Sequence, residues 1–405
     1  MNKEIITIGI HEQSAIDQAN NCLNEAEAIF LMADGHKGYG MPVGGVAVYK
    51  NRISPAGVGF DIACGNKAVK LDVKYSDIKD RLENIAQDIW KQISFGVGQK
   101  NNTKVEHELF DNVLWTESNL LKTLKDKAQA QLGTIGSGNH YIDVFKDEDD
   151  YIWIGVHFGS RGLGHTIASH FMKLAGDNVN IMDETPHTLD VNSTNGQDYI
   201  RAMQLAGEYA YAGRDWVCKK VSEIIKANIV EEIHNHHNFA WEETHNGEKY
   251  WVVRKGATPA FPNQKGFVGG SMGENSVIIE GVDSELSKSI FYSTVHGAGR
   301  VMSRTMATGK KKRIVTERTK ENGEKYNFTE WTVVSKGLVN FDEVKKEMKE
   351  KGIVLVGAGA DEAPQVYKRL NEVLEFHKET INILHTLTPL IVCMAGKDEF
   401  DPYKD

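Results

Sequence analysis

The distribution of glycine constrains this chain more than any other feature of its sequence. Its 38 glycines gather in short clusters, most of which carry His, Asp, Asn or Arg at their ends: DGHKGYGMPVGG, SPAGVGFDIACG, LGTIGSGNH, GSRGLGH, KGFVGGSMG, HGAG and VGAGA. Glycine allows tight turns and close backbone approach because it has no Cβ. So many clusters with polar ends indicate loops that converge on a common site.

Between these clusters the apolar residues recur with the periods of helices and strands. Helices are expected over residues 78–93, about 197–233 and about 363–384. Short β-rich runs precede several clusters, at residues 68–73, 151–157, 250–254, 276–281, 289–295 and 353–356. Because no linker or repeat divides the 405 residues, we predict one α+β domain over residues 1–405, with mixed sheets and flanking helices around a central cleft.

Composition and charge argue against several classes of protein. The longest apolar stretch, residues 387–396, is too short to span a bilayer, and the opening MNKEIITIGIHEQSA lacks the apolar core of a signal peptide. The four cysteines show no disulfide-framework spacing, so we expect a cytoplasmic protein. The net charge of −9 argues against a generally basic nucleic-acid binder but is compatible with a local basic cleft.

Several potential metal ligands stand next to glycine or at the end of a predicted strand: Asp61 and Cys64 of GFDIACG, His140 of GSGNHYID, His157 of GVHFGSRGLGH, and His234, His236 and His237 of EEIHNHHN. A buried structural cysteine or a hydrogen-bonded core histidine explains any one of them. Together, a thiol, a carboxylate and several imidazoles favour a metal site. Carboxylate oxygens favour Mn²⁺ or Mg²⁺, and sulfur favours softer ions.

The segment STVHGAGRVMSR indicates phosphate chemistry. His296 follows a predicted strand, and the backbone N–H groups of the next three residues can form a nest for an anion. Arg300 and Arg304 would face one phosphate if a helix starts there, and Arg161 on its glycine-rich turn also suits a phosphate. A histidine in this setting can be a general base, a metal ligand or a nucleophile toward phosphorus, and the segment alone does not choose among them.

Three further segments indicate ligand binding less clearly. KGFVGGSMGENS offers Ser271, Asn275 and Ser276 as donors to a phosphate or ribose, and Tyr367 offers an aromatic face for a base or for packing. The run KKKR at residues 310–313 is typical of a solvated loop, but it follows HGAGRVMSR closely and can instead form the edge of an RNA track. Neither a P-loop nor a Rossmann fingerprint is present.

Together, FDIACG, GSGNH, VHFGSRGLGH, HHN, GGSMG, VHGAGRVMSR and DEAPQVYK resemble, in the expected order, the motifs of the RtcB family of RNA ligases. The resemblance extends from about residue 32 to residue 396. It implies an α+β catalytic domain of the family's own type that uses two Mn²⁺ ions and GTP. It also implies joining of RNA ends that carry a 3′-phosphate or 2′,3′-cyclic phosphate to ends that carry a 5′-hydroxyl, in RNA repair or tRNA splicing.

The resemblance also implies residue roles. The metal ligands would be Asp61, Cys64, His140, His157 and His237, with Cys64 bridging and with His237 preferred over His234 and His236 because it precedes Asn238. His296 would be the guanylylated nucleophile, and Asp34 of MADGHKGYG would orient its imidazole. The other matching positions would bind the guanylate (Asn139, His140, Asp143, Asn238, Gly269, Gly270, Ser271, Met272, Ser276, Gly297, Ala298, Gly299 and Tyr367) or phosphates of GTP or RNA (Arg161, Arg300 and Arg304).

In the implied reaction, His296 attacks the α-phosphorus of GTP while Mn²⁺ stabilises the developing charge. A cyclic phosphate is first opened to a 3′-phosphate by metal-activated water. The 3′-phosphate then takes the guanylate from His296 and becomes an RNA–pp–G end, and the 5′-hydroxyl displaces GMP.

Three positions depart from the family pattern, and all concern nucleotide recognition. Asp143 stands where the family usually has Glu, and Gly269 stands where a proline is expected. Ala395 takes the place of a near-terminal lysine, with Lys397 two residues later. These departures leave the expected metal ligands and His296 unchanged, so they bear on the affinity for GTP and not on the type of chemistry.

Two other functions use part of the same residue set. A metal-dependent phosphodiesterase or cyclic-phosphate hydrolase needs the Asp, Cys and His ligands but no covalent His296. A non-catalytic RNA-binding module needs neither these ligands nor the HGAGR segment, and their presence argues against it. RNA ends with a 3′-phosphate and a 5′-hydroxyl distinguish the three functions, because each gives a different product.

Overall fold

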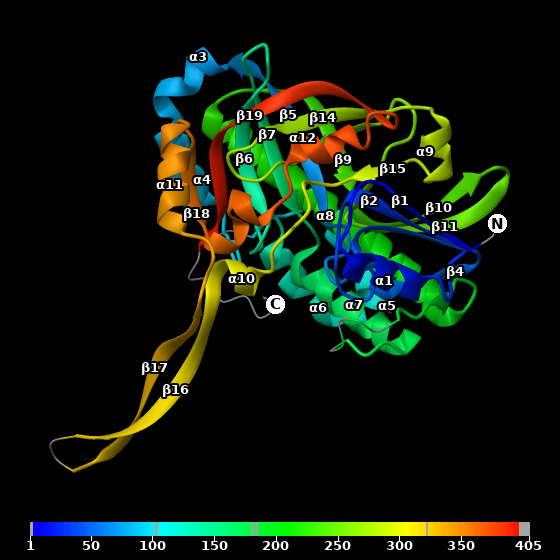
Figure 1. The fold of residues 1–405 in the computed structure, drawn as a ribbon, viewed down its shortest axis with the longest axis horizontal. Coiled ribbons are helices and arrows are strands. Elements are labelled where there is room, and N and C mark those ends of the chain that lie inside the picture. The colour runs from blue at the N-terminus through cyan, green and yellow to red at the C-terminus, as the bar shows by residue number, and fades with distance from the viewer. Residues whose placement is uncertain are drawn as a thin grey trace.

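Two β-sheets form the framework of the protein, and one of the passages between them takes place at a single residue. The computed structural model describes residues 3–101, 104–179, 181, 183, 185–320 and 323–396 (Figure 1). Strand β9 (Ile229–His236) ends the larger sheet and strand β10 (Asn238–His245) ends the smaller one, with His237 between them. The predicted α+β class is confirmed.

The larger sheet has eight strands and is covered on both faces. Helices α4 (Leu82–Gln92) and α8 (Thr194–Ile225) share a core with one face, and α11 (Phe341–Glu350) shares a core with the other. Burial on both faces explains why residues 152–158 and 277–279 of this sheet read as nearly continuous apolar runs. The strand order is β13 (Lys265–Val268), β14 (Ser276–Gly281), β19 (Ile381–Gly396), β6 (Tyr141–Lys146), β7 (Tyr151–Phe158), β5 (Gly65–Lys74) and β9, and β18 (Val354–Ala358) pairs in parallel with β19.

The smaller sheet has five strands, in the order β1 (Glu4–Thr7), β2 (Ala28–His36), β3 (Val43–Tyr49), β11 (Glu248–Lys255) and β10. Strands β1 and β2 are parallel and are connected through α1 (Gln13–Cys22). This helix buries Ala15, Ala19 and Cys22, which recur on one face. One side of the sheet shares a core with α8 and with α7 (Arg161–Ala175).

Shorter elements complete the described part of the chain. The remaining strands form pairs: β12 (Ala257–Pro259) with β15 (Ser293–Val295), β4 (Arg52–Ile53) with β8 (Leu189–Asp190), and β16 (Gly309–Thr319) with β17 (Lys325–Lys336). The remaining helical segments are α2 (Pro55–Val58), α3 (Tyr75–Ile78), η1 (Lys79–Arg81), η2 (Glu108–Asp111), α5 (Leu114–Glu117), α6 (Asn119–Gln131), α9 (Glu285–Ser289), α10 (Arg304–Thr308), η3 (Ala360–Glu362), η4 (Pro364–Val366) and α12 (Leu370–Glu375). Within the described residues, no helix has the length and apolar character needed to cross a membrane.

Most predicted elements are confirmed. The helical stripe over 78–93 corresponds to α3 and α4, which bury Ile78, Leu82, Ile85 and Ile89. The expected strands at 68–73, 151–157, 250–254, 276–281 and 353–356 correspond to β5, β7, β11, β14 and β18.

The predicted bounds of two helices are wrong. The helix expected to reach residue 233 ends at Ile225, because Lys226 adopts a left-handed φ of 68° and its N–H bonds back to the Ser222 carbonyl. Residues 229–236 then form β9. The helix expected over 363–384 exists only as α12, because Pro364 begins a separate short turn and β19 starts at Ile381.

Two shorter segments also differ from expectation. The strand predicted at 289–295 begins only at Ser293, since the preceding residues form α9 and a turn in which Phe291 and Tyr292 have positive φ. The KKKR run at 310–313 is not a loop but the start of β16. Figure 1 shows β16 and β17 leaving the body of the protein as a long hairpin.

Candidate functional site

Neighbouring strands of the larger sheet bring the expected metal ligands together. Four neighbouring strands lie in the order β6, β7, β5 and β9. His157 of β7 lies opposite the first residue of β6 on one side and the second residue of β5 on the other. The first residue of β5 lies opposite the last residue of β9. His140, Cys64 and His237 lie just outside β6, β5 and β9. The pairing therefore gathers residues that are far apart in sequence at one end of these strands.

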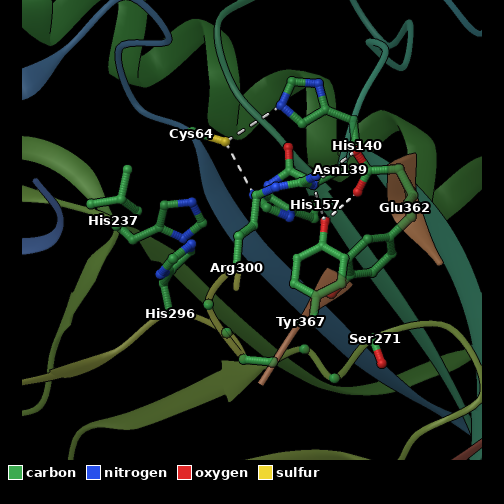
Figure 2. A pocket seen from close by; sticks show the side chains of 18 of the residues that line it. Cys64, Asn139, His140, His157, His237, Ser271, His296, Arg300, Glu362 and Tyr367 are labelled. Atoms are coloured by element: carbon green, nitrogen blue, oxygen red, sulfur yellow. Dashed lines mark hydrogen bonds and ion pairs between the residues drawn. The ribbon is translucent and has the colours of Figure 1, made fainter. Parts of the chain in front are cut away.

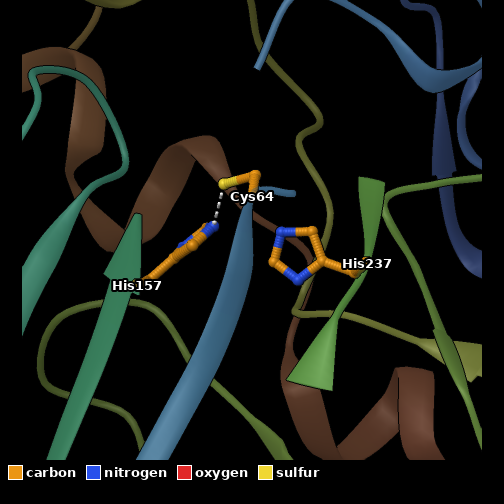
Figure 3. Close-up of side chains that lie close together, drawn as sticks. All are labelled: Cys64, His157 and His237. Atoms are coloured by element: carbon orange, nitrogen blue, oxygen red, sulfur yellow. Dashed lines mark hydrogen bonds between the residues drawn. The ribbon is translucent and has the colours of Figure 1, made fainter. Parts of the chain in front are cut away.

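Cys64 belongs to two groups of potential metal ligands. It forms one group with His157 and His237 (Figure 3) and another with Asp61 and His140, and the ligand atoms of each group lie within 4.8 Å of one another. Its Sγ is 3.2 Å from Nε2 of His157 and 3.6 Å from Nε2 of His140. That His140 nitrogen is 3.0 Å from Oδ2 of Asp61. A sulfur shared by two ligand groups suits two neighbouring cations.

The protonation states of this cluster fit a divalent cation. Burial, reinforced by nearby histidines, lowers the pKa of His157 and of His237 well below the usual range, so both imidazoles are neutral and able to bind metal. Burial raises the pKa of the Cys64 thiol, and a bound cation reverses that effect by favouring the thiolate. Among the described residues, Nδ1 of His140 and Nδ1 of His237 have no hydrogen-bond partner.

A buried arginine holds the other two histidines of the HNHH sequence away from this cluster. His234 and His236 are two residues apart in β9 and share one face of the strand. The Arg214 guanidinium of α8 lies 2.7 Å from Nε2 of His234 and 2.9 Å from Nδ1 of His236. It also donates to the Ala63 carbonyl at 3.0 Å and so fixes the chain directly before Cys64.

His296 lies next to the cluster and is held by Asp34. The ring centres of His296 and His237 are 4.8 Å apart. Nδ1 of His296 is 2.6 Å from Oδ2 of the fully buried Asp34, and the backbone N–H of His296 donates to the same oxygen at 3.0 Å. Burial alone would raise the pKa of Asp34, but its contacts with His296 outweigh burial and lower it. An ionised Asp34 keeps a proton on Nδ1 and leaves the lone pair on Nε2.

The glycine turn after His296 packs closely against Asp34. The Gly297 N–H also donates to Oδ2 of Asp34, at 3.4 Å. The sequence predicted that this N–H group helps to bind an external anion. That prediction is wrong for this group, because the anion that it contacts is the protein's own carboxylate. At Gly299, where φ is 78°, a Cβ would lie 2.1 Å from the Asp34 carbonyl oxygen, so only glycine fits.

Two arginines converge on the carboxylate of Glu362. Arg300 places Nη1 3.5 Å from Oε1 of Glu362 and donates to the Tyr367 hydroxyl at 3.2 Å (Figure 2). Arg304 contacts Glu362 and lies 3.0 Å from a carboxylate oxygen of Asp361. Helix α10 starts at Arg304, so the idea that both arginines share a helix face is wrong. Both nevertheless line the same pocket, where two carboxylates partly balance their charge.

Most of the expected site residues line one pocket of about 290 Å³ (Figure 2). Its lining includes Asp61, Cys64, Asn139, His140, Asp143, His157, His237, Asn238, Gly269, Gly270, Ser271, Met272, His296, Gly297, Ala298, Gly299, Arg300, Arg304 and Tyr367. Asp34, Arg161 and Ser276 are outside this lining. Arg161 donates to the Gly96 carbonyl at 3.3 Å, and the Ser276 hydroxyl accepts from the Gly270 N–H at 3.0 Å.

The positions that depart from the family pattern have different surroundings in the structure. Asp143 has a buried carboxyl group whose pKa burial raises well above the usual range. Its Oδ1 and the Tyr141 hydroxyl have no hydrogen-bond partner within the described ranges, and both residues line the pocket. At Gly269, a Cβ would lie 2.2 Å from that hydroxyl, so Tyr141 explains why no proline stands there. Ala395 is buried, and Lys397 lies outside the described residues.

Sequence reasoning missed several lining residues: His36, Val43, Tyr141, Lys255, Gly256, Glu362, Val392 and Met394. Lys255 carried a signal similar to that of His157, since it directly follows the predicted strand at 250–254 and precedes a glycine. Its buried Nζ contacts the carbonyl oxygen of Tyr39, and burial lowers its pKa to about 8. Glu362 lies inside the DEAPQVYK motif, but its partners Arg300 and Arg304 are visible only in three dimensions.

Comparisons with known proteins find relatives that match most of the chain. A family model described as tRNA-splicing ligase RtcB matches residues 18–122 and 115–354. The RNA-splicing ligase RtcB of Escherichia coli K12 is 30% identical over 402 residues, which cover 91% of this chain and 90% of the relative. The tRNA-splicing ligases RtcB of Nanoarchaeum equitans and Thermococcus kodakarensis are 28% and 27% identical, over 86% and 89% of this chain and 84% and 86% of theirs.

We predict that Gly269→Ala destabilises the protein by about 1–3 kcal/mol, because the added methyl group collides with the Tyr141 hydroxyl. Tyr141→Phe removes that oxygen and should relieve most of the cost. The free energy of unfolding in urea, measured for both single variants and the double variant, gives the coupling between the two sites. An equal cost of Gly269→Ala with Tyr or Phe at position 141 would contradict the proposed collision.

A second prediction concerns acid stability. His377 is fully buried, its Nε2 accepts from the Ala33 N–H at 3.3 Å, and burial lowers its pKa to about 4. Between pH 6.5 and 4 the unfolded chain therefore binds more protons than the native protein, and the free energy of unfolding falls as the pH falls. This histidine accounts for about 2–3 kcal/mol of that loss at pH 4.5.

His377→Gln keeps an acceptor for Ala33 but cannot be protonated. Its loss of stability between pH 7 and pH 4.5, measured by urea unfolding, should be smaller than that of the native sequence by that amount. Equal losses in the two proteins would show that His377 is not held neutral in the native state.

Proposed function

The chain belongs to the RtcB family of RNA ligases, and we propose that it joins RNA ends bearing a 3′-phosphate or 2′,3′-cyclic phosphate to ends bearing a 5′-hydroxyl. It uses GTP and Mn²⁺ and forms a guanylylated His296. The names of its relatives, RNA-splicing and tRNA-splicing ligases, support RNA as the substrate. One observation supports the proposed use of GTP, Mn²⁺ and His296: the Asp34–His296 pair lies beside two groups of potential metal ligands that share Cys64. We propose one catalytic domain, acting in the cytoplasm in RNA repair or tRNA splicing.

His296 is suited to attack phosphorus through Nε2. Asp34 accepts a hydrogen bond from the Nδ1–H group and stabilises the positive charge that the ring gains during attack. The new bond joins Nε2 to the α-phosphorus of GTP, the bond between that phosphorus and the β-phosphate oxygen breaks, and pyrophosphate leaves. The RNA 3′-phosphate then attacks the same phosphorus and displaces His296, and finally the RNA 5′-hydroxyl attacks the 3′-phosphate and releases GMP.

Asp61, Cys64, His140, His157 and His237 supply oxygen, sulfur and nitrogen donors for two cations. When bound, divalent ions neutralise phosphate charge and polarise phosphorus toward attack. Arg300 and Arg304 also line the pocket, where Arg300 donates to the Tyr367 hydroxyl. Asp143 is suited to recognise a base edge, because its buried carboxyl group has an oxygen with no other partner among the described residues.

We expect the purified protein, given GTP and Mn²⁺, to convert one RNA with a 3′-phosphate and another with a 5′-hydroxyl into a joined product on a denaturing gel. Trimmed ends without joined RNA would contradict ligation and identify a hydrolase. A shifted band on a native gel, with unchanged RNA on the denaturing gel, would identify a non-catalytic RNA-binding module.

Asp34→Asn should slow this joining about 10²- to 10⁴-fold, because the amide no longer stabilises a positively charged His296 and favours the wrong tautomer. Asp150→Asn is a matched exchange at an exposed position and should keep the native rate. Equal rates for Asp34→Asn and the native protein would show that Asp34 does not position His296.

The shared cysteine predicts a pattern of metal stoichiometry. After loading with Mn²⁺ and gel filtration, elemental analysis should find two ions per native chain. His140→Ala should remove one ion, because His140 belongs to only one ligand group, whereas Cys64→Ala should reduce both sites. Retention of two ions by Cys64→Ala would contradict a bridging role.

A further inference from the structure

The β16–β17 hairpin, here called the arm, is not part of the pocket and has no assigned role. It comprises residues 309–336 and projects from the body of the protein next to α10 (Figure 1). Its first strand has 11 residues, which corresponds to a length of roughly 36 Å. The strands are paired along their full length, from Gly309 opposite Lys336 to Thr319 opposite Lys325.

The arm carries a charge opposite to that of the chain as a whole. Residues 309–336 contain eight Lys and Arg and four Glu, a net charge of +4, whereas the whole chain carries −9. The base of the arm, residues 309–313 with 331–336, contains five basic residues and no acidic one. Glu317, Glu324 and Glu330 lie farther along the arm, and Glu321 lies outside the described residues. Positive charge is therefore concentrated where the arm meets the body.

The basic side chains differ in their pairing along the arm. Toward the tip, Lys320 lies 2.8 Å from Glu324, and Lys325 lies 2.8 Å from Glu317. At the base, Lys310, Lys312 and Lys336 are exposed, and none of the three forms an ion pair with any residue that the structure describes. Their ammonium groups are available to an anionic partner.

The base of the arm is connected directly to the wall of the pocket. Arg304 lines the pocket and starts α10, and α10 runs directly into β16. On the return strand, the N–H groups of Leu338 and Val339 donate to the carbonyls of Met306 and Ala307 in α10, at 3.0 and 3.2 Å. The arm therefore leaves the body at the wall of the pocket formed by Arg304.

A polymer that reacts in this pocket has to continue outside it. The pocket volume of about 290 Å³ is small even for one drug-sized ligand, so nucleotides beyond the reacting end lie on the surface. A chain of net charge −9 repels a polyanion unless a local surface is basic. We propose that the base of the arm, residues 309–313 and 331–336, binds the phosphate backbone of the RNA substrate next to the ligation pocket. This inference rests on the proposed function, since it takes the bound polyanion to be that substrate.

Exposed apolar residues on the arm do not require a protein partner. Val315, Val333 and Val334 are each more than half exposed. A two-stranded ribbon has no interior, and β-branched residues favour the extended backbone of its strands. Self-association through these valines is the alternative that the experiment has to detect.

Fluorescence anisotropy with a labelled single-stranded RNA of about 20 nucleotides bearing a 3′-phosphate tests the proposal, at 50 to 200 mM salt and without GTP. In one variant Lys310, Lys312 and Lys336 become Gln, and in a second they become Arg, which keeps the charge. A third variant changes three exposed lysines on the body, Lys74, Lys79 and Lys91, to Gln. Thermal melting establishes that each variant is folded.

We expect the Gln variant of the arm to bind RNA about tenfold or more weakly at low salt. Its plot of log affinity against log salt should be shallower by about 2, since three phosphate contacts contribute about 0.7 each. The Arg variant and the body variant should match the native protein. Native affinity and slope in the folded Gln variant would overturn the proposal. So would an altered sedimentation coefficient with unchanged RNA binding, which would assign the arm to a second copy of the chain.

This test is independent of catalysis, because it contains no GTP and forms no bond. If the native protein binds RNA through the arm but joins no ends, the proposed ligation fails while this inference stands. If it joins ends and the Gln variant binds RNA as the native protein does, the inference alone fails.

Discussion

The register of β6, β7, β5 and β9 is the constraint on which the site depends. No single strand supplies a complete set of potential metal ligands, because these residues, from Cys64 to His237, come from distant parts of the sequence. Backbone pairing aligns His157 with the starts of β6 and β5, and the end of β9 with the start of β5. A shift by one residue would turn each side chain of a strand to the other face. The buried cores on both faces of the sheet resist such a shift and so keep Cys64 among its partners.

A second constraint is that the buried charges of the site are satisfied by partners from other elements. Asp34 comes from the smaller sheet, whereas His296 follows a short strand outside both sheets. Arg214 comes from α8 and holds His236 and the chain before Cys64. Removing one member of such a pair leaves an uncompensated buried charge, which is strongly destabilising. His296 and the proposed metal ligands are therefore positioned only when the two sheets have assembled.

The sequence predicts the residues of this site better than their geometry. Glycine clusters with polar ends identified most of the pocket lining, because close backbone approach is a local requirement that only glycine meets. The extent of the helices near residues 226–233 and 363–384 was wrong, since apolar residues there belong to strands whose partners are remote. The role of Arg214, the contacts of Glu362 and the fit of Gly269 to Tyr141 are long-range relations. Neither the composition nor the periodicity of apolar residues carries information about such long-range contacts.

The central claim, that His296 carries the nucleotide, is tested most directly by incubating the protein with α-labelled GTP and Mn²⁺ and comparing it with His296→Ala. The account predicts an acid-labile covalent label, with the added mass of GMP, on the peptide that contains His296 and none on the folded variant. A label of equal intensity on His296→Ala, or no label on a native protein that is folded and has bound its metal, would contradict it.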